Sequence, residues 1–309
     1  MQRRVGAVLL AMLAFGVARP VVAAEVLYAG PEADPAFGEL APELLTALFP
    51  EHRLALQPAG DAEAALDHVV QEPGAVAIAD LASMLDYTTR HALPADQLRF
   101  GSPLARHCLL AFARRGGWVR GFADIADATG TPRPAIGLVG PDAATTLAEL
   151  RRFEPGLAGL EVQPGSAAEQ AARVARGSLD LLLLVAHAGI DDAVAEQLAD
   201  DDRLTELPVV TRLLARAAAG SDSGFTLAAY RPDSGVIAWV EQPPMTLCTP
   251  IGVVLRGDAS PELRTAFDRA AGAIAARLQK RGLAGRAVAS AKAALRDVVG
   301  TIHGWLGDP

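Results

Sequence analysis

The sequence predicts an α/β protein of two similar lobes, each a mostly parallel sheet flanked by helices, joined by a two-strand hinge. Residues 54–79 (LALQPAGDAEAALDHVVQEPGAVAIA) and 160–185 (LEVQPGSAAEQAARVARGSLDLLLLV) repeat one unit: a strand ending in Gln-Pro, a turn, an Ala-rich amphipathic helix and a second strand. Near-continuous apolar runs at 75–79, 135–139 and 179–185 are typical of parallel strands covered on both faces. Strands that alternate with helices of about 10–15 residues indicate βαβ units.

The predicted elements alternate regularly through most of the chain. The first half is expected to hold a strand at 26–29, a helix at about 38–48, the first copy of the unit, a helix at 81–91 and a strand at 106–113. The second half is expected to hold a short helix at 122–128, a strand at 134–139, a helix at 143–153 and the second copy. Beyond residue 190 we expect helices at 191–200 and 211–219, strands at 204–210 and 247–256, and final helices at about 260–281 and 285–306.

These elements place the crossings between the lobes at two points of the chain. The chain is expected to leave the first lobe after the strand at 106–113 and to return at the strand at 247–256. Lobe I then comprises residues 25–112 plus 248–309, and lobe II comprises residues 113–247. A hinge of two strands allows one lobe to close on the other around a ligand.

The N-terminus has the pattern of a secretory signal peptide over residues 1–24. Arg3 and Arg4 precede an apolar run at 5–18, and Val22-Ala23-Ala24 supplies small residues for cleavage. The alternative is an uncleaved N-terminal anchor, although the apolar run is short for a membrane span. We therefore expect a mature protein in the periplasm, and no lipid anchor, because no Cys lies near the cleavage site.

Composition and motifs exclude several classes of function. The formal net charge is −8 and no basic tract occurs, so nucleic acid is not an expected partner. The chain has no G-x-S-x-G, P-loop or G-x-G-x-x-G motif, and its six histidines show no metal-ligand spacing. We therefore expect no enzyme activity, no catalytic residue, no metal and no cofactor. The chain has 5% aromatic and 51% hydrophobic residues, and this composition favours a cleft lined by aliphatic side chains over one lined by stacked aromatic rings.

Cys108 and Cys248 lie on two predicted strands of an exported chain. A disulfide between them is one interpretation, since the periplasm is oxidising. The alternative is a pair of buried free thiols that pack as small apolar groups. The role is structural in either case.

Ligands of open α/β lobes bind beyond the carboxyl ends of the strands, where loops lead into helices. Asp61 and Asp142 start two such helices, either as N-caps or, if they face the cleft, as partners of a cationic or hydroxyl-bearing ligand. Asp80 follows a buried strand, either as a ligand contact or as the cap of the next helix. The further candidates in these loops are Tyr28, Asp34, Gly60, Gly140, Thr145 and Thr146, the two threonines as hydroxyl donors.

Three further candidates lie near the ends of the second lobe's elements. His187 follows the apolar strand at 179–185 and either lines the cleft or serves as a structural histidine. Tyr230 and Trp239 lie in the segment that re-enters the hinge, where they either form a cleft wall or pack in the core.

Three stretches of the chain resemble the type II periplasmic substrate-binding proteins. They are PAGDAEAALDHVVQEPGAVAIADLASM (58–84), ARHCLLAFARRGGWVRGFADIAD (105–127) and PAIGLVGPDAATTLAELRRF (134–153). Within that class the chain is most similar to the solute receptors of TRAP transporters of the TAXI family, related to ABC binders of the phosphonate/nitrate type. Two departures count against a standard small anion as ligand: GPEADPAFG replaces a Ser/Thr-rich glycine loop, and Pro141-Asp142 stands where Gly-Ser is expected.

The resemblance implies a monomeric extracytoplasmic protein that captures a small molecule in an inter-lobe cleft. The ligand would then be delivered to membrane transporter subunits, of TRAP or ABC type. Two alternatives stay open: a shuttle for a lipid or another hydrophobic molecule on the same scaffold, and a sensor or accessory subunit without a transport role.

Overall fold

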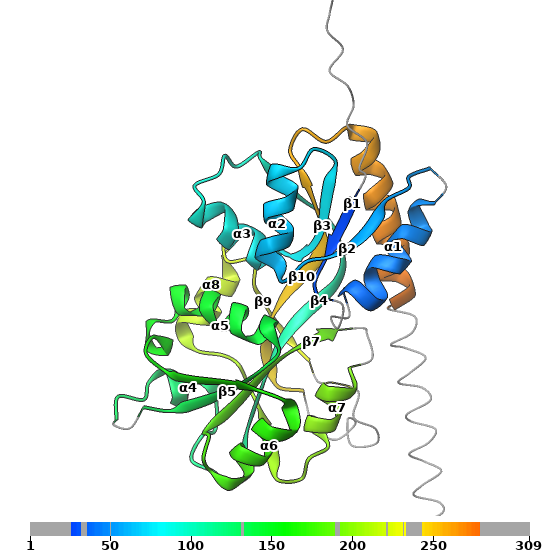
Figure 1. The fold of residues 1–309 in the computed structure, drawn as a ribbon. Helices are drawn as coiled ribbons and strands as arrows, with labels where there is room; N and C mark the ends of the chain where they lie inside the picture. Colours follow the sequence, from blue (N-terminus) through cyan, green and yellow to red (C-terminus); the bar gives the residue numbers. More distant parts are fainter. Residues whose placement is uncertain are drawn as a thin grey trace, which may run out of the picture.

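In the computed structural model, residues 26–31, 36–49, 51–130, 133–188, 192–220, 222–230, 232 and 243–278 are described. Their ten strands form one sheet with the order β2-β1-β3-β10-β4-β7-β5-β6, while β8 pairs with β4 and β9 pairs with β10. Figure 1 shows two helix-flanked lobes connected by long strands, with α1, α2 and α3 (blue to cyan) in the upper lobe and α4 to α7 (green) in the lower lobe. The predicted two-lobed α/β class is confirmed.

Lobe I is built on three parallel strands with β1 in the middle. Residues of β1 (Val26–Ala29) pair with both β2 (Ala55–Pro58) and β3 (Ala75–Asp80). The helices of this lobe are α1 (Ala41–Leu48), which continues a π-helical turn at Ala36–Leu40, α2 (Ala62–Gln71) and α3 (Leu81–Arg90). A further helical segment over 261–278 packs with α1 through buried residues such as Leu44, Phe267 and Ile274.

Lobe II repeats this arrangement. Here β5 (Ala135–Val139) lies in the middle and pairs in parallel with β6 (Glu161–Gly165) and β7 (Leu181–Ala188). The other elements are α4 (Phe122–Ala126), α5 (Pro141–Phe153), a 3-10 turn at Pro155–Leu157, α6 (Ala167–Arg176), α7 (Ala193–Ala199), β8 (Leu204–Leu207), α8 (Arg212–Ala219) and β9 (Thr226–Ala229).

Two long antiparallel strands connect the lobes. The strand β4 (Leu98–Arg114) pairs with β10 (Met245–Arg256) up to Cys108, and it pairs with β7 from Arg106 onward. On its other edge, β10 pairs with β3 of lobe I. Cys108 and Cys248 face each other in the β4–β10 register and form a disulfide. Of the two interpretations of this cysteine pair, the disulfide is therefore the correct one, and it lies at the junction of the lobes.

Local chemistry explains why the repeated unit folds alike in both copies. Asp61 accepts a hydrogen bond from the Ala64 backbone N–H and begins α2, while Ser166 accepts one from the Glu169 N–H and begins α6. These N-caps satisfy donors that have no partner within the helix. Gly177 ends α6 with φ of 76°, a left-handed conformation that a residue without Cβ adopts at little cost.

The main difference from the expected elements is the length of β4. It begins at Leu98 rather than at residue 106, although Gly101 and Pro103 interrupt the sequence pattern. The structure absorbs them where the β4–β10 register shifts, between Ile251 and Val254, and a bulge of this kind tolerates a proline.

Smaller differences concern the ends of helices and the last third of the chain. The helix α5 begins at Pro141, two residues earlier than expected, because proline is favoured in a first helical turn. The strand β9 lies in a stretch that the sequence pattern left irregular. The predicted signal peptide and the helix expected at 285–306 lie outside the described residues. Within the described residues, no helix combines the length and apolar character that a membrane crossing requires.

Candidate functional site

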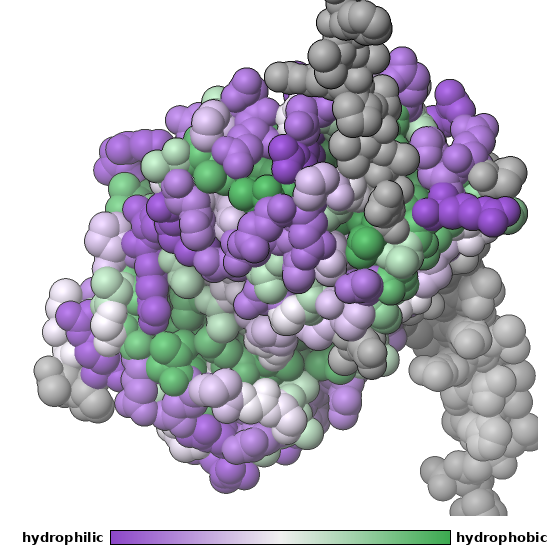
Figure 2. All heavy atoms as spheres, turned by 45° about the horizontal axis from the view of Figure 1, so that its top comes forward, coloured by the Kyte–Doolittle hydropathy of each residue, from purple (hydrophilic) through white to green (hydrophobic). Residues whose placement is uncertain are grey.

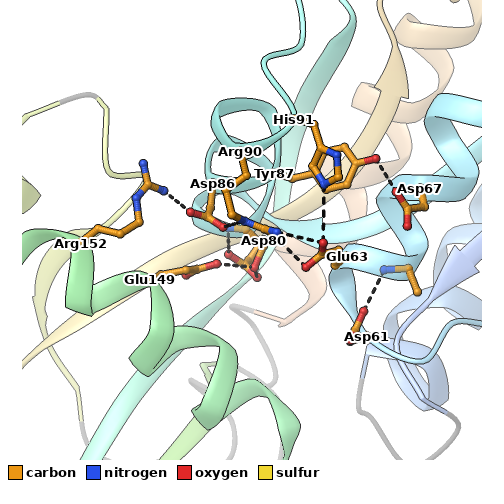
Figure 3. Close-up of polar contacts among 12 residues, drawn as sticks. Asp61, Glu63, Asp67, Asp80, Asp86, Tyr87, Arg90, His91, Glu149 and Arg152 are labelled. Atoms are coloured by element: carbon orange, nitrogen blue, oxygen red, sulfur yellow. Dashed lines mark hydrogen bonds and ion pairs between the residues drawn. The ribbon is translucent and has the colours of Figure 1, made fainter. Parts of the chain in front are cut away.

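The two lobes contact each other through polar side chains of α3 and α5. Ser83, at the start of α3, places its hydroxyl oxygen 2.9 Å from Glu149 Oε1 of α5. The same oxygen lies 2.7 Å from Asp80 Oδ2, and Asp80 Oδ1 accepts the Ser83 backbone N–H at 2.8 Å. All three residues are buried. Figure 3 shows Glu149 reaching from the green helix of lobe II toward Asp80 in lobe I.

Burial sets the protonation of this cluster. Desolvation raises the pKa of Asp80, and desolvation together with the charges of Asp80 and Asp86 raises the pKa of Glu149 to about 9. A serine hydroxyl has one hydrogen and cannot donate to both carboxyl groups at once. The contacts are satisfied when Glu149 is protonated and donates to Ser83 Oγ, which in turn donates to Asp80. The raised pKa of both carboxyl groups and the single hydrogen of Ser83 favour one proton held within this cluster between the lobes.

An ion pair lies next to this cluster. Asp86 of α3 accepts hydrogen bonds from Arg90, one turn further along α3, and from Arg152 of α5. Arg90 also holds Glu63 of α2 through two hydrogen bonds of 3.0 and 2.9 Å. Figure 3 shows Asp86 between the two arginines. The carboxylate is 12% exposed and Arg152 is 40% exposed, so the pair between the lobes is partly open to solvent.

Two backbone donors at the amino end of α3 have partners within the protein itself. The Ala82 N–H donates to Thr249 Oγ1 of β10 at 3.1 Å, and the Ser83 N–H donates to Asp80. Gly224 packs against the Ala82 backbone so closely that a Cβ there would lie 2.8 Å from Ala82 atoms. Two N–H groups of this helix terminus therefore have partners within the protein, and the carboxyl groups beside it disfavour a free anion.

A second polar group lies at the carboxyl end of the lobe II strands. His107 of β4 and His187 of β7 face each other in register, and their Nε2 atoms are 2.6 Å apart. Their rings are nearly perpendicular, with centroids 4.2 Å apart. Asp142, in the first turn of α5, lies with them: one ligand atom from each of the three residues falls within 4.8 Å of the others.

Helical periodicity connects these two groups. Asp142, Thr145 or Thr146, Glu149 and Arg152 follow one another at three- and four-residue steps along α5. Residues at that spacing share one helix face. One face of α5 therefore runs from the histidine pair at the hinge to the α3 contact, and it forms the lobe II side of the inter-lobe surface.

The structure brings three of the predicted site residues to this surface: Asp80, Asp142 and His187. Asp80 caps α3, which was one of its two interpretations, and its second carboxylate oxygen contacts Ser83 at the lobe interface, while its role as a ligand contact stays a prediction. The N-cap interpretation of Asp142 is wrong, since Gly140 occupies that position with φ of 79° and no side chain caps α5. Thr145 and Thr146 are half-buried on α5.

Other predicted residues have partners within a lobe. Tyr28 is buried, stacks on His68 with centroids 4.0 Å apart and donates to Glu72 at 2.8 Å. Asp61 caps α2 beside the exposed Gly60. Tyr230 is partly buried and packs against the core cluster that includes residues of β4, α6 and β7. Asp34 and Trp239 lie outside the described residues.

Sequence reasoning missed Ser83, Asp86, His107, Glu149 and Arg152. The helical spacing from Asp142 to Glu149 and Arg152 was a usable signal for two of them. No local signal pairs His107 with His187, because 80 residues separate them and only the β4–β7 register joins them.

Surface shape adds little to the definition of this site. A depression of about 400 Å³ lies away from it, where the end of α1 meets the segment 261–278, and it is lined by Glu51, His52, Pro261, Glu262, Thr265, Ala266 and Arg269. Figure 2 shows a face that is largely polar, with apolar groups gathered across its middle. The candidate site is therefore defined by the contacts between the lobes rather than by an open cavity.

No protein-family model matches the chain, and no curated protein matches it in sequence. Solved structures do match its fold. XAC2383 from Xanthomonas citri bound to ATP aligns with a TM-score of 0.50 and 12% identity, over 84% of this chain and 88% of that chain. An ancestral arginine-binding protein bound to arginine aligns with a TM-score of 0.47 and 10% identity, over 84% and 97%. At these identities the likeness concerns the fold.

A third match has the same character. The substrate-binding protein of an amino acid ABC transporter aligns with a TM-score of 0.46 and 8% identity, over 83% of this chain and 96% of that chain.

Proposed function

We propose that this protein is an extracytoplasmic solute-binding protein that captures a small molecule between its lobes for delivery to an inner-membrane transporter. The observation that carries the proposal is the polar contact of α3 with α5, formed beyond the carboxyl ends of the strands in both lobes. Among the described residues, β4 and β10 are the strands that link the two half-sheets. Two lobes on a two-strand connection, with facing polar surfaces, are suited to hinge closure around a solute.

The lobe limits of the proposal are residues 25–112 plus 248–309 for lobe I and 113–247 for lobe II. Their support is the change of partner along β4, which pairs with β10 up to Cys108 and with β7 from Arg106. The contacts Ser83–Glu149 and Asp86–Arg152 then hold a conformation in which the lobes touch. A solute that replaces these contacts shifts the populations of open and closed states.

The charges of the site favour a solute with ammonium or hydroxyl donors. Asp80, Asp86 and Glu149 converge on the interface, and two backbone donors at the start of α3 already have partners in the protein. A cation placed between Asp80 and Glu149 would lower both raised pKa values and release the shared proton. XAC2383 was solved with ATP, but a polyphosphate is a poor match for these carboxyl groups. A lipid is also disfavoured, because the facing groups are polar.

The remaining parts of the proposal concern location and partners. We place the mature protein in the periplasm as a monomer without enzyme activity, exported by the segment 1–24. Its transporter partner is of the TRAP type served by TAXI receptors or of the related ABC type. The exported pattern of the N-terminus and the resemblance of residues 58–84, 105–127 and 134–153 support this placement.

Native mass spectrometry of the protein exported with its own leader tests the proposal. We expect a bound small molecule, or binding from a panel of amines, amino acids and polyols, and a thermal shift with the same compound. The variant Glu149→Ala should lose it, while Ser166→Ala, which alters only a helix cap, should retain it. No binding across that panel, nucleotides and lipids would contradict the function. Binding of nucleotides alone would contradict the solute class.

A further inference from the structure

We propose that His107, His187 and Asp142 form a binding site for a divalent transition-metal ion, with Zn²⁺ as the ion that this donor set suits best. One atom from each residue lies within 4.8 Å of the other two. The residues come from three elements, β4, β7 and α5, that meet only in the folded protein. The inference goes beyond solute capture and does not depend on it.

The backbone fixes the two imidazoles opposite each other. His107 and His187 are directly paired in the antiparallel β4–β7 ladder, so their side chains lie on the same face of the sheet. The neighbouring Cys108 is tied to β10 by the disulfide, which restrains β4 at this position. Asp142 is positioned by the turn Gly140-Pro141 at the start of α5. Ligands on strands and at a helix start are held more firmly than ligands on a loop.

The distances fit a metal site after a small adjustment. The two Nε2 atoms are 2.6 Å apart and their rings meet nearly at right angles. Two imidazole nitrogens bound to one tetrahedral Zn²⁺ at about 2.0–2.1 Å lie roughly 3.3 Å apart. Small rotations of the two side chains open that space without moving either strand.

The donor set selects the class of ion. Imidazole nitrogen with one carboxylate suits Zn²⁺ and its transition-metal neighbours, whereas Mg²⁺ and Ca²⁺ prefer oxygen ligands. Three protein ligands leave one position of a tetrahedral Zn²⁺ for water or another small ligand. His187 is 2% exposed and the other two residues are half-buried, so the ion would be partly shielded from solvent.

Zn²⁺ titration of the tag-free mature chain, after dialysis against a chelator, tests the site by calorimetry and by competition with a chromogenic chelator. We expect one equivalent of Zn²⁺ per chain. The variants His107→Gln, His187→Gln and Asp142→Asn should each weaken binding at least about tenfold, since even outer-shell partners of metal ligands carry 10–100-fold effects. The matched controls are His68→Gln and His91→Gln, because each of these histidines also lies beside a carboxylate.

Two further measurements separate a metal site from a hydrogen-bonded histidine pair. Co²⁺ should give the absorption bands of tetrahedral coordination in the wild type and in both controls, and lose them in His107→Gln and Asp142→Asn. Circular dichroism checks the fold of each variant. If His187→Gln does not fold, the half-buried His107 and Asp142 variants decide the outcome. Binding that is absent in the wild type, or equal in the three site variants and the controls, overturns the proposal.

Discussion

The two lobes share one topology, but their third strands end in different chemistry. In lobe I, β3 has six residues and ends at Asp80, whose carboxylate caps α3. In lobe II, β7 has eight residues and brings His187 opposite His107 of β4. The repeated βαβ unit therefore supplies the framework, while the residues at the strand ends give each wall of the interface its own charge and donors.

The helices that follow the first strand of each lobe differ as well. In lobe I, the π-helical turn and α1 together span residues 36–48, and α5 of lobe II spans Pro141–Phe153, so the two helical segments are equally long. They differ in what they contact: α1 packs within lobe I, whereas Glu149 and Arg152 of α5 contact α3 of the other lobe. Lobe II therefore contributes α5 to the interface, and lobe I contributes Ser83 and Asp86.

The largest expected effect comes from the joint that both lobes share. Replacing Cys108 and Cys248 together by alanine removes a cross-link that closes a separation of 140 residues. We expect the free energy of unfolding to fall by about 2–5 kcal/mol. Urea denaturation followed by circular dichroism and by tryptophan fluorescence measures the loss.

The same experiment reports on the independence of the lobes. Without the disulfide, we expect the two probes to separate into two transitions, because each lobe has core clusters of its own. A loss below about 0.5 kcal/mol with coincident transitions would contradict a structural role for the disulfide at the junction.

The next effect compares a buried cap of lobe I with an exposed cap of lobe II. Asp80→Ala removes the α3 cap and leaves the Ser83 N–H without its acceptor, so we expect a loss of about 1–3 kcal/mol. Ser166→Ala removes the exposed cap of α6 and should cost about 0.5–1 kcal/mol. Equal losses in urea denaturation would mean that burial at the interface adds nothing to the cap.

The buried carboxyl group of Glu149 makes the free energy of unfolding depend on pH. Burial raises the pKa of Glu149 to about 9, above its ordinary value of 4.5, so the folded state binds more protons than the unfolded state between these values. The stability therefore falls as pH rises through that window, with a slope of at most about 1.4 kcal/mol per pH unit. Asp80, Asp86 and Arg152 are the charged groups that act on Glu149.

Denaturation of Glu149→Gln from pH 5 to pH 9 measures this contribution. We expect the variant to have a flatter profile than the wild type and to gain relative stability toward pH 9. If the substitution leaves the pH profile of stability unchanged, the shared proton is not bound by Glu149.

The smallest expected effect on stability belongs to the Asp86–Arg152 pair. Arg152→Ala removes a 40% exposed partner, while Arg90 still holds Asp86, so a loss of about 0.5 kcal/mol or less is expected. Thermal denaturation of the wild type and the variant at low and at high salt measures the loss. The difference in stability between the two proteins should vanish at high salt, because salt screens the pair in the wild type. A loss that salt does not change would point to packing by the arginine stem instead.

Much of the fold was predictable because it depends on local patterns. The Gln-Pro strands, the Ala-rich helices and the apolar strands of both copies lie where the sequence placed them, since periodicity and capping residues act over a few positions. The first eight residues of β4 were not predicted, because Gly101 and Pro103 end a strand in any local pattern and only the bulged partner strand accommodates them.

The candidate site was predictable only in part, for a related reason. Asp80, Asp142 and His187 lie at or just beyond strand ends, which sequence can locate. Ser83 and Glu149 gain their importance from each other, across 66 residues of chain, and His107 gains its importance from the register with His187. Contacts of this kind arise from tertiary packing, and they leave no local pattern in a single sequence.

We infer that the lobes close on each other through α3 and α5. Pulsed electron paramagnetic resonance measures the distance between the lobes directly. The spin labels are placed at the exposed Gln71 of α2 and Arg176 of α6, which lie in opposite lobes. We predict a short and a long distance in the wild type, and a shift toward the long distance when Ser83→Ala and Arg152→Ala remove the inter-lobe contacts. A single distance, unchanged by both substitutions and by any bound solute, would contradict the claim.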